Sequence, residues 1–171
     1  ILYSPEVLQA SNSVNQICFG ETTAEISVTL TGGTSPFTYV WSDNNSLNVA
    51  SRAGLAPGTY TITVTDDNGC SSTTTATATA NPQILIPGSV TNECTGYANG
   101  SVDITPTGGT GGFSYEWFKS PDLITVLAIT QDHAGLNPGT YVVFIEDGVG
   151  CTASASFVVG SIPNPTGTIT A

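Results

Sequence analysis

Basic residues are nearly absent from this chain of 171 residues, in which one arginine and one lysine face thirteen acidic residues. The formal net charge is −11 at pH 7. Nucleic acids and anionic membrane surfaces attract proteins through clustered lysine and arginine side chains. The composition therefore excludes nucleic acid as a partner. Apolar runs are also short, and none approaches the roughly 20 residues of a membrane span, so we expect no membrane insertion.

Methionine is missing altogether, and the first residues, ILYSPEVLQA, lack the basic start and long apolar stretch of a secretory signal. These absences predict a processed or internal segment of a longer product. Charged residues make up only 9% of the chain, while threonine, serine and glycine are abundant. Such a composition, poor in helix formers, favours an extracellular β protein.

An internal repeat organises what is present. GGTSPFTYVWSD at residues 32–43 returns as GGTGGFSYEWFK at residues 108–119, which is 76 positions later. LAPGTYTITVTDDNGC at residues 55–70 returns as LNPGTYVVFIEDGVGC at residues 136–151, which is 81 positions later. The difference places a five-residue insertion in the second copy, after its tryptophan. Repetition of this kind is the signature of tandem modules.

Proline-containing segments mark the module boundaries, because ANPQ at residues 80–83 is echoed by IPNP at residues 162–165. We therefore predict one module over residues 1–81 and a second over residues 82–163. Residues 164–171 are expected to form a linker or the first strand of a following repeat.

Alternation of apolar and polar residues with a period of two predicts half-buried antiparallel strands. The predicted strands cover residues 24–30, 60–65, 72–80, 100–105, 141–146 and 152–159. No apolar pattern of helical period persists, so the fold class is all-β. About seven short strands per module, separated by glycine and proline turns, predict tandem immunoglobulin-like β-sandwiches.

Aromatic residues at alternate positions are expected to fill the two sandwich cores. The predicted core residues are Phe37, Tyr39, Trp41 and Tyr60 in the first copy, and Phe113, Tyr115, Trp117 and Tyr141 in the second. Tyr97 and Phe118 lie off this inward face and are the candidates for exposed aromatic rings.

Four cysteines occupy matched positions in the two copies: Cys18, Cys70, Cys94 and Cys151. Four cysteines allow three pairings, and the repeat favours one bridge inside each module, Cys18 with Cys70 and Cys94 with Cys151. Such bridges would clamp one end of each sandwich and would place the protein in an oxidising compartment. Zinc binding is not expected, because no closely spaced cysteine and histidine ligands occur.

The combined pattern resembles the SprB repeat, a module of very large surface adhesins of gliding bacteria. The first copy carries the resemblance on Cys18, Gly32-Gly33-Thr34, Pro36-Phe37, Tyr39, Trp41, Leu55, Gly58, Tyr60, Asp66 and Gly69-Cys70. The second copy carries it on Cys94, Gly108-Gly109-Thr110, Phe113, Tyr115, Trp117, Leu136, Gly139, Tyr141, Asp147 and Gly150-Cys151. It departs at Gly112 and Phe118, where the family has proline and serine, and in its insertion. PKD-type modules are similar more loosely.

The resemblance implies an exported, non-enzymatic surface protein with a structural or adhesive role, including gliding motility. Its partners would be neighbouring repeats or subunits of the same protein and an unidentified surface or glycan ligand. Two alternatives remain open. The chain would otherwise be a subunit of a non-covalent filament built by strand exchange, or a carbohydrate-binding module.

Catalysis and cofactor binding have little support in the sequence. His133 is the only histidine, and a neighbouring Asp132 has the wrong geometry for a catalytic triad. Asp66, Asp67 and Asn68 supply hard oxygen ligands and are weak calcium candidates, although a full calcium-binding loop is missing. The same Asp-Asn-Gly pattern is also typical of a turn stabilised by its own side chains.

Overall fold

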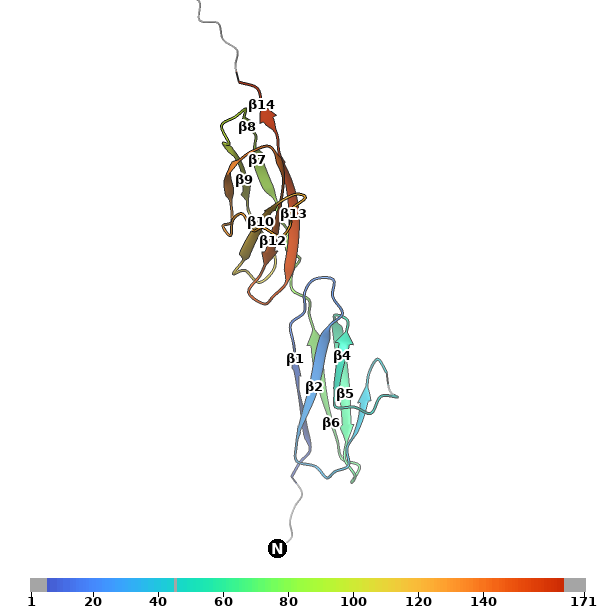
Figure 1. Cartoon of the computed structure of the whole chain (residues 1–171). Coiled ribbons are helices and arrows are strands. Elements are labelled where there is room, and N and C mark those ends of the chain that lie inside the picture. Colours follow the sequence, from blue (N-terminus) through green and yellow to red (C-terminus); the bar gives the residue numbers. More distant parts are fainter. Residues whose placement is uncertain (1–5, 45, 165–171) are drawn as a thin grey trace, which may run out of the picture. The chain divides into compact units, whose positions relative to one another are not determined.

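A computed structural model describes residues 6–44 and 46–164 of the chain, and these residues form strands and no helix (Figure 1). Two compact units, Ile1–Asn81 and Pro82–Ala171, divide the chain. The predicted all-β class is confirmed, with separate sheets in each unit. The prediction of a linker or further strand at residues 164–171 falls almost wholly outside the described residues.

Two three-stranded antiparallel sheets form the first unit. One sheet has the order β1-β2-β4 and the other has the order β3-β5-β6. The strands are β1 (Gln9–Val14), β2 (Ala24–Thr31), β3 (Thr38–Trp41), β4 (Ser51–Leu55), β5 (Gly58–Thr65) and β6 (Ser71–Ala78). Their apolar residues alternate with threonine and serine, so each sheet presents one apolar face to the other.

The second unit repeats this topology with the sheets β11-β9-β7 and β10-β12-β13, and adds a short parallel pair, β14-β8. Its strands are β7 (Gly88–Thr91), β8 (Glu93–Cys94), β9 (Gly100–Ile104), β10 (Ser114–Lys119), β11 (His133–Leu136), β12 (Gly139–Glu146), β13 (Thr152–Val159) and β14 (Ser161–Ile162). Register is repeated as well, because Trp41 lies opposite Ile62 and Trp117 lies opposite Val143.

Each unit has its own apolar core around its tryptophan. Trp41 and Trp117 are fully buried, and Tyr60 and Tyr141 are buried at the edge of the same clusters. The other four predicted core aromatics are half-buried and pack against these clusters: Phe37, Tyr39, Phe113 and Tyr115. Each core cluster therefore includes the indole ring of its unit.

Phe118 differs from the sequence expectation, because only 6% of its surface is exposed. Its ring packs edge-to-face on Phe144, with a centroid distance of 5.6 Å. Tyr97 is 69% exposed. A strand residue on the outward face is usually solvated, but a neighbouring aromatic ring on the same face gives Phe118 a partner.

Paired glycines end the strand before each tryptophan strand. Gly32 and Gly108 have φ values of 66° and 78°, in the region that side chains disfavour. A Cβ at Gly108 would lie 1.9 Å from the carbonyl oxygen of Gln83, and one at Gly32 would lie 2.3 Å from that of Val7. The first glycine of each pair is therefore required both for its conformation and for the close approach of the segment that begins each module.

Candidate functional site

The proximal end of each unit, where the chain enters it, is built around one aspartate. In the first unit the Asp66 carboxylate accepts hydrogen bonds from the backbone N–H groups of Asn68 (3.0 Å) and Cys70 (2.8 Å) through one oxygen. Its other oxygen accepts the N–H of Thr34 at 3.0 Å. The predicted calcium candidates thus form a closed turn, and calcium binding there stays a prediction.

Asp147 plays the same part in the second unit. Its oxygens accept the N–H groups of Val149 (3.0 Å), Cys151 (2.9 Å) and Thr110 (2.9 Å). Burial opposes ionisation of Asp147, but these backbone hydrogen bonds outweigh it and hold the pKa below its usual value of 3.8. Because the D-x-x-G-C pattern recurs in both copies, the repeat itself was the signal for this structural role.

The distal end, where the chain leaves each unit, is closed by a short parallel pairing. In the first unit Ile17 pairs with Ala80, and the N–H of Asn81 donates to the Ile17 carbonyl at 2.8 Å. In the second unit β8 pairs with β14, which places Cys94 opposite Ile162. Cys18 and Cys94, the residues after Ile17 and Glu93, therefore lie at the distal ends.

Glu93 is a buried carboxylate at the distal end of the second unit, with 2% of its surface exposed. It accepts the N–H groups of Gly96 (2.7 Å) and Tyr97 (3.0 Å), and the Ser161 hydroxyl (3.1 Å). Burial alone would raise the pKa of Glu93, but the hydrogen bonds outweigh it and lower the pKa. The ionised Glu93 side chain therefore connects the turn after β8 to β14. The equivalent residue in the first unit is the apolar Ile17.

The predicted cysteine pairing is wrong. Cys70 and Cys94 are free thiols, while Cys18 and Cys151 are disulfide-bonded, so neither predicted bridge, Cys18–Cys70 or Cys94–Cys151, forms. The reason is the position of the cysteines in their own module. The eight residues of β6 lie between the turn at Cys70 and the distal end, a span of about 26 Å at about 3.3 Å per residue. A disulfide joins Cα atoms only about 4.4–6.8 Å apart.

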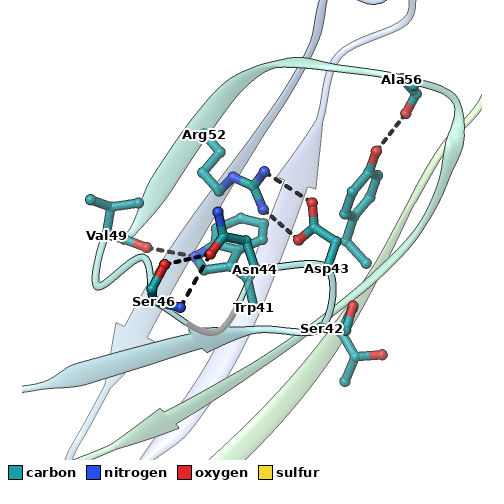
Figure 2. A network of polar contacts seen from close by, with 10 residues as sticks. Trp41, Ser42, Asp43, Asn44, Ser46, Val49, Arg52 and Ala56 are labelled. Atoms are coloured by element: carbon teal, nitrogen blue, oxygen red, sulfur yellow. Dashed lines mark hydrogen bonds and ion pairs between the residues drawn. The ribbon is translucent and has the colours of Figure 1, made fainter.

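A polar clamp covers the tryptophan of the first unit (Figure 2). The Arg52 guanidinium lies over the Trp41 ring at 4.9 Å and binds the Asp43 carboxylate through two nitrogens, at 2.5 and 3.0 Å. This hydrogen bonding lowers the pKa of Asp43 below its usual value of 3.8. The indole N–H donates to the Val49 carbonyl at 2.9 Å. The clamp fixes the connection between β3 and β4.

Replacement of Arg52 by alanine is expected to lower the free energy of unfolding of the first unit by about 1–2 kcal/mol. An exposed ion pair contributes roughly 0–1 kcal/mol and a cation–π contact roughly 0.5–1 kcal/mol. Asp43→Asn removes the ion pair but keeps the cation over the ring, so it is expected to cost less. Urea unfolding of both variants at low and high salt measures the difference. An equal loss in the two variants would contradict a role for the ring contact.

His133 occupies the place of Arg52 in the second unit, 81 positions later. Its ring lies 5.7 Å from Trp117 and 5.9 Å from Tyr141. Lys119, the counterpart of Asp43, lies over Tyr141 at 5.4 Å, and these side chains line one hollow. The only histidine of the chain thus packs on core aromatics, which is a structural role and not the arrangement of a catalytic triad.

Burial lowers the pKa of His133 below its usual value of 6.5. The folded state therefore binds its proton less readily than the unfolded state. The contribution of neutral His133 to the free energy of unfolding is therefore fully present above pH 6.5. It decreases as the pH falls below that value. A titration of the single histidine ring by NMR is expected to give a midpoint below 6.5. A midpoint at or above 6.5 would contradict burial against Trp117.

A groove of about 710 Å³ lies on the second unit, along β10 and β12. Its wall combines aromatic rings with polar groups: Phe113, Tyr115, Phe144, Glu116, Glu146 and Gln131. Burial raises the pKa of Tyr115, and the charge of Asp132 raises it further. The Tyr115 hydroxyl lies 3.4 Å from the Gln131 side-chain oxygen. Ile129, which is 73% exposed, lines the same groove.

The insertion of the second copy exposes further apolar residues. Leu123, Ile124, Val126 and Leu127 are 44–91% exposed. Asp122 holds the loop, because its carboxylate accepts the N–H groups of Ile124 and Thr125 at 2.9 and 3.3 Å. Sequence reasoning identified the insertion but not its exposed apolar character.

Neither a helix long and apolar enough to cross a membrane nor a cluster of three metal-binding His, Cys, Asp or Glu side chains occurs within residues 6–44 and 46–164.

Solved structures with some similarity to this chain include multi-domain ectodomains of the immunoglobulin type. The N-terminal eight Ig domains of Down Syndrome Cell Adhesion Molecule have a TM-score of 0.42 and 12% identity, over 91% of this chain and 25% of theirs. The ectodomain of mouse nectin-like molecule 4 has a TM-score of 0.39 and 14% identity, over 94% of this chain and 66% of its own. The chain thus spans a quarter of the first and just under two thirds of the second.

Sequence comparison gives a more specific result. No curated protein matches the chain. The SprB repeat family matches at residues 10–46 and again at residues 89–119. The first segment includes Cys18 and Trp41, and the second includes Cys94 and Trp117, so each match contains a distal cysteine and a core tryptophan. The resemblance to the SprB repeat is confirmed, with one matching segment in each unit.

Proposed function

We propose that the chain is a non-catalytic, structural and adhesive segment of a large secreted repeat protein at a bacterial cell surface. The observation that carries the proposal is the duplication: two copies of one sandwich, each with its own core around a tryptophan. SprB-repeat matches in both copies support an adhesive or structural surface-protein segment. A disulfide favours an oxidising, extracytoplasmic location. Participation in gliding motility belongs to the same proposal.

Surface display tests this function directly. An antibody against the chain should label intact cells, and brief protease treatment of those cells should remove the label together with surface attachment. An internal deletion of the segment that keeps the rest of the protein exported should lower attachment without abolishing display. Labelling only after permeabilisation would contradict the proposal.

A non-covalent filament built by strand exchange is the less favoured alternative. One edge open to such pairing would be the threonine-rich β6, which has no charged residue to discourage it. In the first unit β1 lies along this edge: the Asn12 side chain donates to Thr74 at 2.6 Å and to the Thr75 carbonyl at 3.1 Å. The N–H of Ala10 also donates to Ser72 at 3.1 Å. An edge that already has partners favours a covalent array of neighbouring repeats.

The groove of the second unit favours a glycan as the adhesive ligand. Aromatic rings beside carboxylate and amide groups offer an apolar face and hydrogen-bond partners together, a common composition for small-ligand sites. Binding of soluble oligosaccharides to the chain, followed by calorimetry, tests this. Tyr115→Ala is expected to weaken binding by about tenfold or more, the usual loss for a central aromatic contact. The matched variant Tyr39→Ala, in the first unit, should leave binding unchanged; equal effects would contradict this site.

A further inference from the structure

Basic side chains are scarce in this chain, and the second unit places one of them in a hollow whose wall has no acidic residue. The hollow measures about 310 Å³ and is lined mainly by Lys119, His133, Asn137, Tyr141 and Leu127. Lys119 is one of two basic residues and His133 is the single histidine, whereas thirteen residues are acidic. Among the described residues, no aspartate or glutamate lines the hollow. A carboxylate from outside the chain would therefore meet a positive charge there and no competing acid on the wall.

The first unit fills the equivalent place with an ion pair of its own. There the Arg52 guanidinium lies over the Trp41 ring and binds the Asp43 carboxylate. Lys119 stands 76 positions after Asp43, and so replaces the acid of this pair by a base. His133 stands 81 positions after Arg52. Within residues 6–44 and 46–164 the only salt bridge is that of Arg52 with Asp43, so no carboxylate of this part of the chain pairs with Lys119.

The ammonium group of Lys119 has a defined position at the hollow. Its nitrogen lies over the Tyr141 ring, 5.4 Å from the ring centroid. The stem of the side chain passes Gly139, where an added Cβ would lie 2.6 Å from the Lys119 Cε atom. At Gly58, the equivalent glycine of the first unit, the nearest atom to an added Cβ is 3.7 Å away. Glycine at position 139 therefore leaves room for the lysine to lie against the sheet.

The other walls of the hollow suit a sugar ring. His133 is half-buried, and its neutral imidazole has one nitrogen that donates and one that accepts. Asn137 is exposed and offers an amide donor and a carbonyl acceptor, while Leu127 adds an apolar surface. The Asp132 carboxylate, next to His133 in the sequence, accepts the N–H of Ile104 at 2.9 Å. A few polar groups around an apolar wall are typical of a small-ligand site.

We propose that this hollow binds the carboxylate of an acidic sugar. Lys119 is the counter-ion of the carboxylate, and the side chains of His133 and Asn137 exchange hydrogen bonds with the sugar hydroxyls. The inference rests on the proposed adhesive function only for the choice of a sugar as ligand. The hollow shares no lining residue with the groove at Tyr115, so it is a separate site. A single sugar unit is bound with a Kd on the order of millimolar, as expected for so small a ligand.

An NMR titration of the whole chain with glucuronate tests the site, because the His133 ring is the only imidazole and lines the hollow. Glucose, which has a hydroxymethyl group in place of the carboxylate, and acetate, which has no sugar ring, are titrated at the same fixed pH. We expect a saturable shift of the His133 signals, with a Kd for glucuronate at least about tenfold lower than for glucose or acetate. Equal binding of glucose or of acetate would overturn the inference, as would His133 signals that do not shift with glucuronate.

Two variants that change the net charge equally locate the binding charge. Lys119→Gln is expected to weaken glucuronate binding by about tenfold or more, the usual loss for a hydrogen bond to a charged group. Arg52→Gln removes the other base of the chain, in the first unit, and should leave binding unchanged. An equal effect of the two variants would overturn the role of Lys119.

Asn137→Ala keeps the charge of the hollow and removes an exposed amide, so it is expected to keep the fold. It should weaken glucuronate binding severalfold, and unchanged binding would overturn the contact with the sugar hydroxyls. Tyr115→Ala, in the separate groove, should leave glucuronate binding unchanged. Antibody labelling of intact cells tests the proposed function independently, because it does not involve glucuronate.

Discussion

Replacement of Trp117 by alanine is expected to lower the free energy of unfolding of the second unit by about 3–5 kcal/mol, the range for loss of a fully buried large aromatic side chain. The indole is completely buried, and its N–H donates to the Thr130 carbonyl at 2.9 Å. The variant loses this hydrogen bond and the contacts with His133 and Phe157. It also leaves a cavity where the two sheets meet.

Hydrogen exchange followed by mass spectrometry measures this effect in each unit separately. Amides of β10 and β12 should lose protection in the Trp117→Ala variant, while those of β3 and β5 keep it. Trp41→Ala is the matched control and should give the reverse pattern, because each unit has its own core cluster. Equal loss of protection in both units from either variant would contradict the assignment of separate cores.

Gly108→Ala is expected to cost the second unit at least about 2–3 kcal/mol. An L-residue at a φ of 78° costs about 1 kcal/mol by itself. The added Cβ would also lie 1.9 Å from the Gln83 carbonyl oxygen, a backbone atom that moves only with the segment preceding β7. Gly108 therefore allows the segment around Gln83, at the start of the second unit, to lie against the turn that precedes β10.

Gly111→Ala separates the two causes. Gly111 has a φ of 77°, but no atom lies within 4 Å of its Cβ position. This control should cost only the conformational part, about 1 kcal/mol. Thermal unfolding of both variants at one pH measures the difference, and equal midpoints would contradict the close approach at Gly108.

The strands and the core tryptophans were accessible to sequence reasoning because their physical signals are local. Alternation with a period of two predicted β2 and β5, and the same alternation placed Trp41 and Trp117 inward. Phe118 was missed because its burial depends on Phe144, which is on a strand that begins some 20 residues later. The sequence also did not predict that Arg52 packs on Trp41 and that His133 packs on Trp117 at the equivalent position. That prediction requires the path of the chain between β3 and β4.

The cysteine pairing failed for a reason of topology. Successive hairpins reverse direction at every turn, and four reversing strands between Cys18 and Cys70 would bring both to one end. In the structure β3 and β4 run in the same direction, because β3 is antiparallel to β5 and β4 is antiparallel to β2 in the opposite sheet. The connection between them crosses from one sheet to the other without a net reversal. Cys70 therefore lies at the opposite end of the module from Cys18.

The size of the native protein tests the central claim, a covalent array of repeats, most directly. Surface material is boiled in denaturant with reductant, separated on a gel and probed with an antibody against this chain. We expect a band far larger than the 17.5 kDa of these 171 residues, because a peptide-linked array survives reduction. A single band near 17.5 kDa would contradict the array and would favour a filament assembled from separate subunits.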